Sequence, residues 1–115
     1  MISSDVIRGY NDTIVLGLLL EGDSYGYALS REIGQRSGGR YQIKETTLYS
    51  TMNRLEKNGY IASYYGDETF GKRRTYYRIT NAGREYYREK CAEWELTKQV
   101  IDRFVPGAAD GKDGQ

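Results

Sequence analysis

The sequence predicts a mainly α fold of the α+β type, in which helices are followed by a small β-hairpin and then by one long helix. Apolar residues recur at helical spacing over four stretches, but between residues 61 and 79 the pattern alternates and is interrupted by a glycine-bounded loop. The last helical stretch is longer than a small domain can cover. With 115 residues, 38% of them hydrophobic and 29% charged, the chain can form one globular domain with a modest core.

The missing residue types narrow the chemistry. The chain has no histidine, which removes Ser-His triads, histidine acid/base catalysis and histidine metal sites. Cys91 is the single cysteine, so an intrachain disulfide is impossible and a reducing cytoplasm is expected. The longest apolar run, residues 14–20, is too short to span a bilayer, and the N-terminus lacks the features of a signal peptide. We therefore expect a cytoplasmic protein that is not an enzyme and has no cofactor or metal.

The charge is unevenly distributed, although the formal net charge is only +1. Residues 41–80 contain seven Lys/Arg and four Asp/Glu, a net charge of +3, whereas residues 1–40 and 81–115 each carry a net charge of −1. The excess of positive charge indicates where an anionic partner would bind.

A first helix is expected from a cap at Ser3, Ser4 or Asp5 to about Gly22. Its inward stripe should comprise Ile7, Tyr10, Ile14 and Leu18, widened by Val15 and Leu19. Its other side carries small or polar residues, namely Gly9, Asp12, Thr13 and Gly17. That side is either ordinary solvent-exposed surface or a second surface that faces a partner chain or a cavity.

A second helix should start at Asp23 or Ser24 and end at Ser37-Gly38-Gly39. Its inward residues should be Tyr27, Leu29 and Ile33. A short extended segment, residues 41–43, follows it.

A third helix, within residues 45–61, has the clearest two-sided pattern. Leu48, Met52 and Leu55 fall on one face, and Asn58-Gly59 provides the helix end. The opposite and flanking faces carry mostly uncharged polar groups: Thr47, Tyr49, Ser50, Asn53 and Arg54. Such a face is either simply solvated or suited to reading a DNA major groove.

A β-hairpin follows, with strands at residues 61–65 and 72–79 and a loop at residues 66–71. Lys72, Arg73 and Arg74 lie at its tip, where they can reach phosphate oxygens. A cation cluster alone is usually just solvated. Here, however, the cation cluster comes directly after a candidate reading helix, and the two features support DNA binding independently. The element order is also that of a winged helix-turn-helix. DNA binding is therefore favoured.

Two other patterns in the chain do not indicate catalysis. Residues 66–73 nearly match a phosphate-binding loop, but Arg73 replaces the magnesium-binding hydroxyl and a strand follows where a helix is needed. The glutamates of the last helix alternate with Lys and Arg, which is typical of a solvated salt-bridge surface and not of a catalytic carboxylate pair.

The last helix should be capped by Thr80 and run over residues 81–105, a length of about 37 Å. A heptad seam runs along it: Tyr87, Cys91, Trp94, Lys98, Ile101 and Val105. Trp94 is either a packing residue of a dimer or an aromatic platform for a flat ligand. The expected organisation is a DNA-binding domain at 1–80, a dimerisation helix at 81–105 and a disordered tail at 106–115.

Several motifs together resemble the PadR family of bacterial transcription regulators: YGY at 25–27, ETTLY at 45–49, RLEKNGYI at 54–61 and GKRRTYYRITNAG at 71–83. The resemblance extends over roughly residues 5–105. It implies a winged-helix homodimer that represses genes and is joined through its C-terminal helix, in which Tyr87, Cys91, Trp94, Ile101 and Val105 would form the interface.

Within the family the chain is most similar to a short subfamily that includes a multidrug-responsive repressor, in which planar drugs slot between two tryptophans at the dimer interface. The similarity implies a pore for a planar aromatic ligand, lined by Val6, Gly9, Asp12, Thr13, Trp94 and Lys98. Lys98 stands where that repressor has an acid and would disfavour cationic dyes. Lys44 stands where a small polar helix cap is common, so Thr46 or Thr47 is expected to cap instead.

The sequence therefore predicts a repressor that binds a palindromic operator. The residues expected at the DNA are Tyr25, Lys44, Thr47, Tyr49, Ser50, Asn53, Lys72, Arg73 and Arg74. The alternative is a DNA-binding or protein-interaction dimer without a small-molecule effector.

Overall fold

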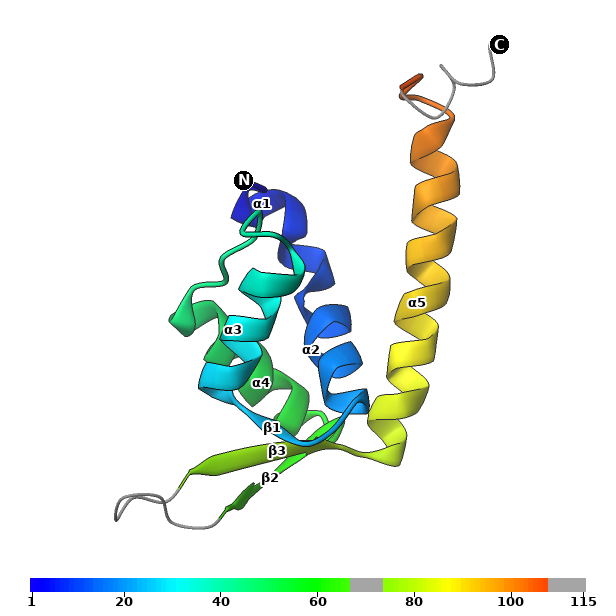
Figure 1. The fold of residues 1–115 in the computed structure, drawn as a ribbon. Coiled ribbons are helices and arrows are strands. Elements are labelled where there is room, and N and C mark those ends of the chain that lie inside the picture. The colour runs from blue at the N-terminus through cyan, green and yellow to red at the C-terminus, as the bar shows by residue number, and fades with distance from the viewer. Residues whose placement is uncertain (67–73, 108–115) are drawn as a thin grey trace.

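Helices and a small sheet surround one apolar centre, and a longer last helix leaves it, in a computed structural model that describes residues 1–66 and 74–107. The helices of the domain are α1 (Ser4–Ile7), the 3-10 turn η1 (Arg8–Tyr10), α2 (Asn11–Leu20), α3 (Gly26–Arg36) and α4 (Glu45–Lys57). The strands are β1 (Ser24–Tyr25), β2 (Ile61–Tyr65) and β3 (Thr75–Ile79), and α5 (Asn81–Asp102) follows them. Figure 1 shows the sheet beneath α2, α3 and α4, with α5 rising beside α2. The predicted mainly helical fold with a small sheet is confirmed.

The inward face of α4 is as the sequence predicted. Leu48, Met52 and Leu55 are at most 1% exposed and form the middle of the core. Gly59 ends the segment with a φ of 82°, a backbone conformation that glycine adopts without strain. Burial of these side chains fixes the opposite, polar face of α4 toward solvent.

The first predicted helix is interrupted. Ser3 caps α1, because its Oγ accepts a hydrogen bond from the Val6 N–H at 3.3 Å, but η1 separates α1 from α2. The most deeply buried residues of α2 are Val15 and Leu19, which were predicted to face inward, and Leu16, which was not. The other predicted inward residues, Ile7, Tyr10, Ile14 and Leu18, are only partly buried. Since α2 is apolar nearly all round, periodicity could not identify the side that faces the core.

Two predictions around α3 are wrong. Ser24 and Tyr25 are not a helix start but the strand β1, and α3 begins at Gly26 without a side-chain cap. Tyr27, predicted to point inward, is 66% exposed, whereas Leu29 and Ile33 are buried. The short strand therefore precedes α3. Residues 41–43, predicted to be extended with alternating burial, pair with no strand in the described part of the chain, but the alternation is present, because Tyr41 and Ile43 are buried and Gln42 is exposed.

The sheet has the strand order β1-β3-β2, with both pairings antiparallel. Ile61 pairs with Ile79, and Tyr25 pairs with Tyr76. The return strand was predicted to start at Lys72, but β3 starts at Thr75. The main chain just before β3 is nevertheless hydrogen-bonded to the end of β2, since the Gly66 N–H donates to the Arg74 carbonyl at 2.8 Å. Lys72 and Arg73 lie outside the described residues.

The long helix α5 starts as predicted and ends earlier. Thr80 Oγ1 accepts a hydrogen bond from the Gly83 N–H at 3.0 Å, which caps the first turn. The helix ends at Asp102, three residues before the predicted Val105, and the predicted tail beyond Gly107 lies outside the described residues. Among the described residues, none of the helices has both the length and the apolar character that a bilayer crossing needs.

Gly83 is where α5 meets the domain most closely, and its replacement by alanine should destabilise the fold. A Cβ at this position would lie 2.0 Å from the Tyr60 carbonyl oxygen, which is backbone and cannot rotate away. We expect Gly83→Ala to lower the free energy of unfolding by about 2–3 kcal/mol, measured by urea denaturation at fixed protein concentration.

Gly9→Ala is the matched control, because a Cβ at Gly9 would have no atom within 4 Å among the described residues. Equal stability of the Gly83→Ala and Gly9→Ala variants would contradict the close approach.

Candidate nucleic-acid interface and the adjoining groove

The outer face of α4, comprising Thr47, Tyr49, Ser50 and Asn53, is accessible along its length. Ser50 and Asn53 are exposed, Tyr49 is 38% exposed and Thr47 is half-buried. Lys44 occupies the N-cap position with its side chain exposed, and this side chain, which has no acceptor, makes no cap hydrogen bond. The prediction that Thr46 or Thr47 caps the helix is wrong, because both lie inside it. A polar face of this kind offers donors and acceptors to base edges.

Tyr49 connects α4 to the first turn of α3. Its hydroxyl approaches Gly26 so closely that a Cβ there would lie 2.1 Å away, so only glycine fits this contact without rearrangement. A hollow of about 320 Å³ opens beside it. It is lined by Tyr25, Gly26, Tyr27, Tyr49, Arg74, Thr75 and Tyr77. Three of the predicted DNA-binding residues, Tyr25, Tyr49 and Arg74, thus lie around one hollow.

At the loop end of the hairpin strands an aromatic cluster positions Arg74. The Arg74 guanidinium carbon lies 4.1 Å from the centroid of the Tyr25 ring, which is a cation-π contact. Tyr25 packs edge-on against Tyr76 at 5.4 Å, and Tyr76 stacks with Tyr64 at 5.8 Å. The Tyr64 hydroxyl donates to Asp23 at 2.6 Å, and this hydrogen bond raises the pKa of Tyr64. Arg74 is therefore held at the side of the hairpin that adjoins α3 and α4.

Asp12 forms a polar contact that the sequence did not reveal. Its carboxylate accepts two hydrogen bonds from the Arg54 guanidinium of α4, at 2.8 and 2.7 Å, and one from the Tyr86 hydroxyl of α5 at 3.0 Å. Burial raises the pKa of Asp12, but the hydrogen bonds and charge of Arg54 outweigh it, so the pKa lies below its ordinary value. For Tyr86, burial and the hydrogen bond to Asp12 raise the pKa.

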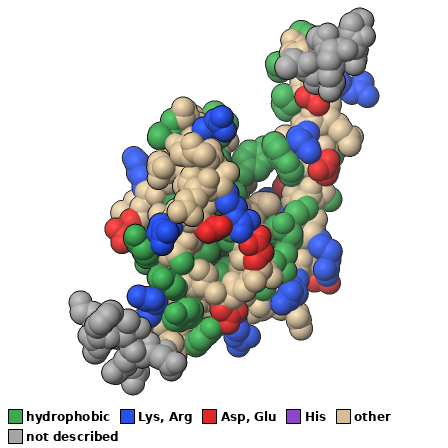
Figure 2. Space-filling view, viewed as in Figure 1, with side chains coloured by type: hydrophobic (Ala, Val, Ile, Leu, Met, Phe, Trp, Pro, Cys, Tyr) green, Lys and Arg blue, Asp and Glu red, His purple; other side chains and the backbone are tan. Residues whose placement is uncertain are grey.

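Trp94 lines a groove between the domain and α5. Its ring meets Tyr10 edge-on, with 5.1 Å between centroids. We call the hollow of about 540 Å³ beside it the Trp94 groove. Its lining is mainly apolar: Ile2, Val6, Ile7, Tyr10, Ile14, Trp94, Thr97, Lys98, Ile101 and Asp102. Figure 2 shows hydrophobic side chains gathered between the domain and α5.

The predicted pore residues are divided in the structure. Val6, Trp94 and Lys98 line the Trp94 groove, and Gly9 and Thr13 line an adjoining hollow that also includes Val6 and Trp94. Asp12 lines neither hollow, because its carboxylate is bound to Arg54 and Tyr86. Lys98 stands 5.6 Å from the Trp94 ring and forms an ion pair with Glu95 at 3.0 Å.

The C-terminal half of α5 and the residues after it expose a row of large apolar side chains: Trp94, Leu96, Val100, Ile101, Phe104 and Val105. Phe104 is 76% exposed. The predicted seam differs at its start, where Tyr87 packs on α2 and would touch a Cβ at Gly17 at 3.3 Å, and Cys91 is half-buried. The large apolar side chains of α5 are thus exposed only along the part of the helix that lies away from the domain.

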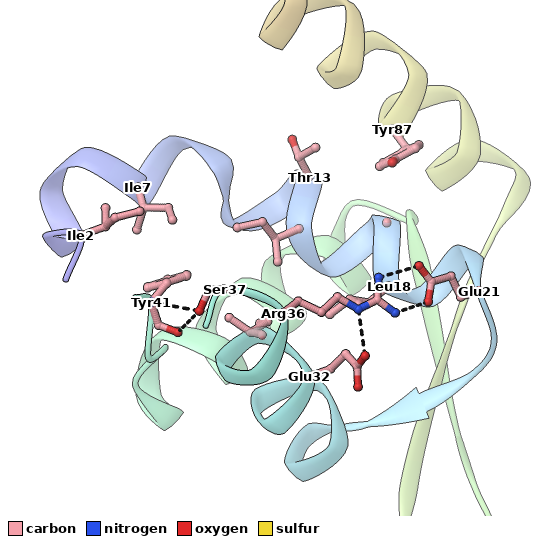
Figure 3. A pocket seen from close by; sticks show the side chains of 13 residues that line it. Ile2, Ile7, Thr13, Leu18, Glu21, Glu32, Arg36, Ser37, Tyr41 and Tyr87 are labelled. Carbon is pink, nitrogen blue, oxygen red and sulfur yellow. Dashed lines mark hydrogen bonds and ion pairs between the residues drawn. The ribbon is translucent and has the colours of Figure 1, made fainter. Parts of the chain in front are cut away.

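A further hollow, of about 410 Å³, is lined by residues of α2 and α3 and by Tyr87 of α5. Figure 3 shows Arg36 extending across it between Glu21 and Glu32. Arg36 forms hydrogen bonds with both carboxylates, with 2.8 Å between its Nε and Glu32 Oε2. Its charge is therefore already compensated within the chain, and we assign it no role at DNA.

The element order, the sheet and the polar outer face of α4 define a winged-helix DNA-binding protein. The family model described as the transcriptional regulator PadR-like family matches residues 15–89. The chain belongs to the PadR-like family of transcriptional regulators. It is thus a DNA-binding regulator of transcription and not an enzyme.

Individual relatives agree with the family. A transcriptional regulator from Clostridium thermocellum is 67% identical and has a TM-score of 0.85, covering 91% of this chain and 99% of its own. A PadR family transcription regulator from Clostridium difficile is 33% identical with a TM-score of 0.71, covering 83% of this chain and 97% of its own. An uncharacterized protein from Lysinibacillus sphaericus is 50% identical over 93% of this chain and 98% of its own.

The Asp12 contact should make stability depend on pH. Because the folded pKa is lowered, its stabilisation is complete above the unfolded value, about pH 4, and is lost as pH falls through the folded pKa. We expect Asp12→Asn to lower the free energy of unfolding by about 1.5–3 kcal/mol at pH 7. The deficit should shrink at pH 3, as measured by urea denaturation at both pH values.

Asp5→Asn serves as the control, because Asp5 also pairs with an arginine but in an exposed position, where little stability is at stake. A deficit for Asp12→Asn that is independent of pH would contradict the ionised contact.

Proposed function

We propose that the protein is a homodimeric repressor that reads a palindromic operator with α4 and is released by a planar aromatic molecule bound at the dimer interface. The observation that carries the proposal is the two-sided character of α4. Its inner face is fully buried while Ser50 and Asn53 stand exposed on the outer face. A helix held in this way can enter a major groove without disturbing the core.

In this proposal α4 supplies the base contacts and its surroundings supply the phosphate contacts. Thr47, Tyr49, Ser50 and Asn53 face the base edges, and Lys44 and Tyr25 lie near the backbone. Lys72, Arg73 and Arg74 bind flanking phosphates or the minor groove. Support for the last of these comes from the Tyr25 ring, which holds the Arg74 guanidinium beside α3 and α4. Phosphate contacts fix the position on the duplex, and base contacts provide the specificity.

The dimer would form through α5. Six large apolar side chains are exposed on or just after its C-terminal half, and exposed apolar side chains gathered on one element are typical of an interaction site. A second copy would cover it through a two-fold axis, which requires an operator of matching symmetry with half-sites about 34 Å or a multiple apart. Residues 1–80 would then be the DNA-binding domain, 81–105 the dimerisation helix and 106–115 a tail.

The effector would bind in the Trp94 groove. A flat ring can stack on the 41% exposed Trp94, and the mainly aliphatic lining excludes water from the ligand. Asp102, one turn further along α5, adds an acid to the lining, but Lys98 lies over the Trp94 ring itself and repels a cation stacked there. We therefore favour a planar aromatic ligand without positive charge. Its effect on DNA must be reciprocal, because ligand weakens DNA binding by the factor by which DNA weakens ligand binding.

The hairpin cations and the outer face of α4 should contribute differently to DNA binding. Replacing Lys72, Arg73 and Arg74 together by alanine should weaken binding to every duplex. It should also reduce the slope of log affinity against log salt by roughly 0.9 for each phosphate that the variant no longer neutralises. Fluorescence anisotropy of labelled operator and random duplexes at several salt concentrations measures both quantities.

Asn53→Ala is the contrasting variant. It should reduce the ratio of specific to random affinity while leaving the salt slope in place. If the triple variant keeps the full salt slope, the hairpin does not contact phosphates. If Asn53→Ala weakens both duplexes equally, Asn53 does not read bases.

A planar aromatic dye without positive charge should quench Trp94 emission saturably and weaken operator binding. Trp94 is the only tryptophan in the chain, so excitation near the red edge of protein absorption reports on this site alone. A Trp94→Leu variant keeps an apolar side chain in the proposed dimer surface, so it should still bind operator but lose the response to the dye. Selective operator binding without any saturable quenching would mean that Trp94 is a packing residue and that the effector, if one exists, binds elsewhere.

A further inference from the structure

Asp12 is a buried carboxylate at the point where three helices meet. Only 8% of the residue is exposed, and its partners come from α4 and α5, 42 and 74 positions away in the chain. A buried charge is stable only when it is paired and fully hydrogen-bonded. The arrangement of α2, α4 and α5 around this carboxylate is therefore strongly constrained.

Arg54 is the partner that lies at the DNA side. It follows Asn53 directly and lies one helical turn after Ser50, so it is adjacent to the outer face of α4. Its side chain is 51% exposed although two of its nitrogens bind Asp12. A guanidinium has five N–H donors, and the bidentate pair with Asp12 uses two of them. The exposed remainder can reach a phosphate oxygen.

Asp12 is also close to the Trp94 groove through its own helix. Tyr10 precedes it by two residues, in the 3-10 turn that leads into α2, and the Tyr10 ring packs against Trp94. The second connection runs through Tyr86, which stacks on Tyr60 with 4.1 Å between ring centroids and is on the same helix as Trp94. A shift of Asp12 would therefore move side chains at the groove.

We propose that Asp12 is a positioning residue that aims Arg54 at a DNA phosphate and couples this contact to the groove around Trp94. The inference rests on the proposed reading role of α4, but it does not require that an effector exists. In the free protein Asp12 holds the guanidinium in one orientation. When a phosphate binds Arg54, it competes with Asp12 for the same cation, and Asp12 shifts relative to Arg54 and Tyr86.

The consequence is that DNA binding changes the surroundings of Trp94. When Asp12 moves, Tyr10 and α5 respond. The Trp94 indole packs against the Tyr10 ring and belongs to α5, so both changes reach it. By reciprocity, any change imposed on the groove biases the placement of Arg54. The protein would thus contain a connection between its DNA surface and its interface helix that consists of one carboxylate and its two partners.

The test measures DNA binding and Trp94 emission in the same titration. The probe is a labelled duplex of roughly three helical turns from the region upstream of the protein's own gene, with a random duplex of equal length beside it. Anisotropy of the label gives the bound fraction, and emission of the single tryptophan gives the response of the groove. In the unaltered protein, we expect Trp94 emission to change in proportion to the bound fraction.

In Asp12→Asn, measured at equal saturation with DNA, we expect this change in emission to disappear. Tyr60→Phe is the matched control, because it removes a hydroxyl from the same aromatic stack but leaves the three hydrogen bonds of Asp12 intact. It should retain the full response. Arg54→Lys keeps the charge but cannot form the bidentate pair, so it should also lose the response and provides a second variant if Asp12→Asn does not fold.

Each outcome is decisive. An unaltered amplitude in Asp12→Asn or Arg54→Lys at saturation overturns the proposal, as does an unaltered protein that binds DNA without any change at Trp94. In both cases the anisotropy still supports DNA reading by α4. If neither duplex binds at low salt, the proposed DNA surface fails, and the positioning role fails with it.

Discussion

The close approach of Gly83 to the Tyr60 carbonyl determines where the long helix leaves the domain. The same carbonyl accepts a hydrogen bond from the Thr80 N–H at 3.0 Å, so the first turn of α5 is attached to the end of α4 and the start of β2. Tyr86 stacking on Tyr60 extends this attachment by one turn. Beyond Tyr87 the helix has few neighbours within the described chain, and its apolar side chains become exposed. The Trp94 groove and the candidate dimer surface both exist because α5 is fixed at one end only.

Helix α2 packs on two sides, against the core and against α5, and this explains what the sequence could and could not predict about it. Val15, Leu16 and Leu19 face the core, while Ile14 lines the groove and Gly17 lies against Tyr87 of α5. A helix covered on two sides has no single apolar stripe, so its periodicity does not indicate an orientation. Helix α4 has one covered side, and its orientation could be predicted from Leu48, Met52 and Leu55 alone. The strand β1 could not be predicted, because two residues form a strand only through pairing with β3, about fifty residues later.

The candidate DNA surface was predictable for a similar reason, and the contact that supports it was not. The exposed polar residues of α4 follow from the buried ones by helical geometry, and the aromatic-rich hairpin follows from its alternation. The pairing of Asp12 with Arg54 depends on how α2 and α4 cross, which no local pattern encodes. The only signal in the sequence is an acidic residue two positions before a long apolar run. The small or polar side that Asp12 shares with Gly9, Thr13 and Gly17 predicts either solvent-exposed surface or a surface that faces a partner chain or a cavity.

A buried carboxylate with an ion-pair partner is often no more stabilising than apolar residues of similar volume would be at such a position. An apolar residue, however, does not fix the relative orientation of the helices that it contacts. The bidentate geometry between Asp12 and Arg54 permits one relative orientation of α2 and α4, and the Tyr86 hydroxyl adds α5 to the same constraint. The contact thereby fixes how α5 lies relative to α4, the candidate DNA-reading helix, whereas hydrophobic packing alone tolerates small rotations and slides. The polar contact therefore occupies the position in the core where orientation matters more than additional stability.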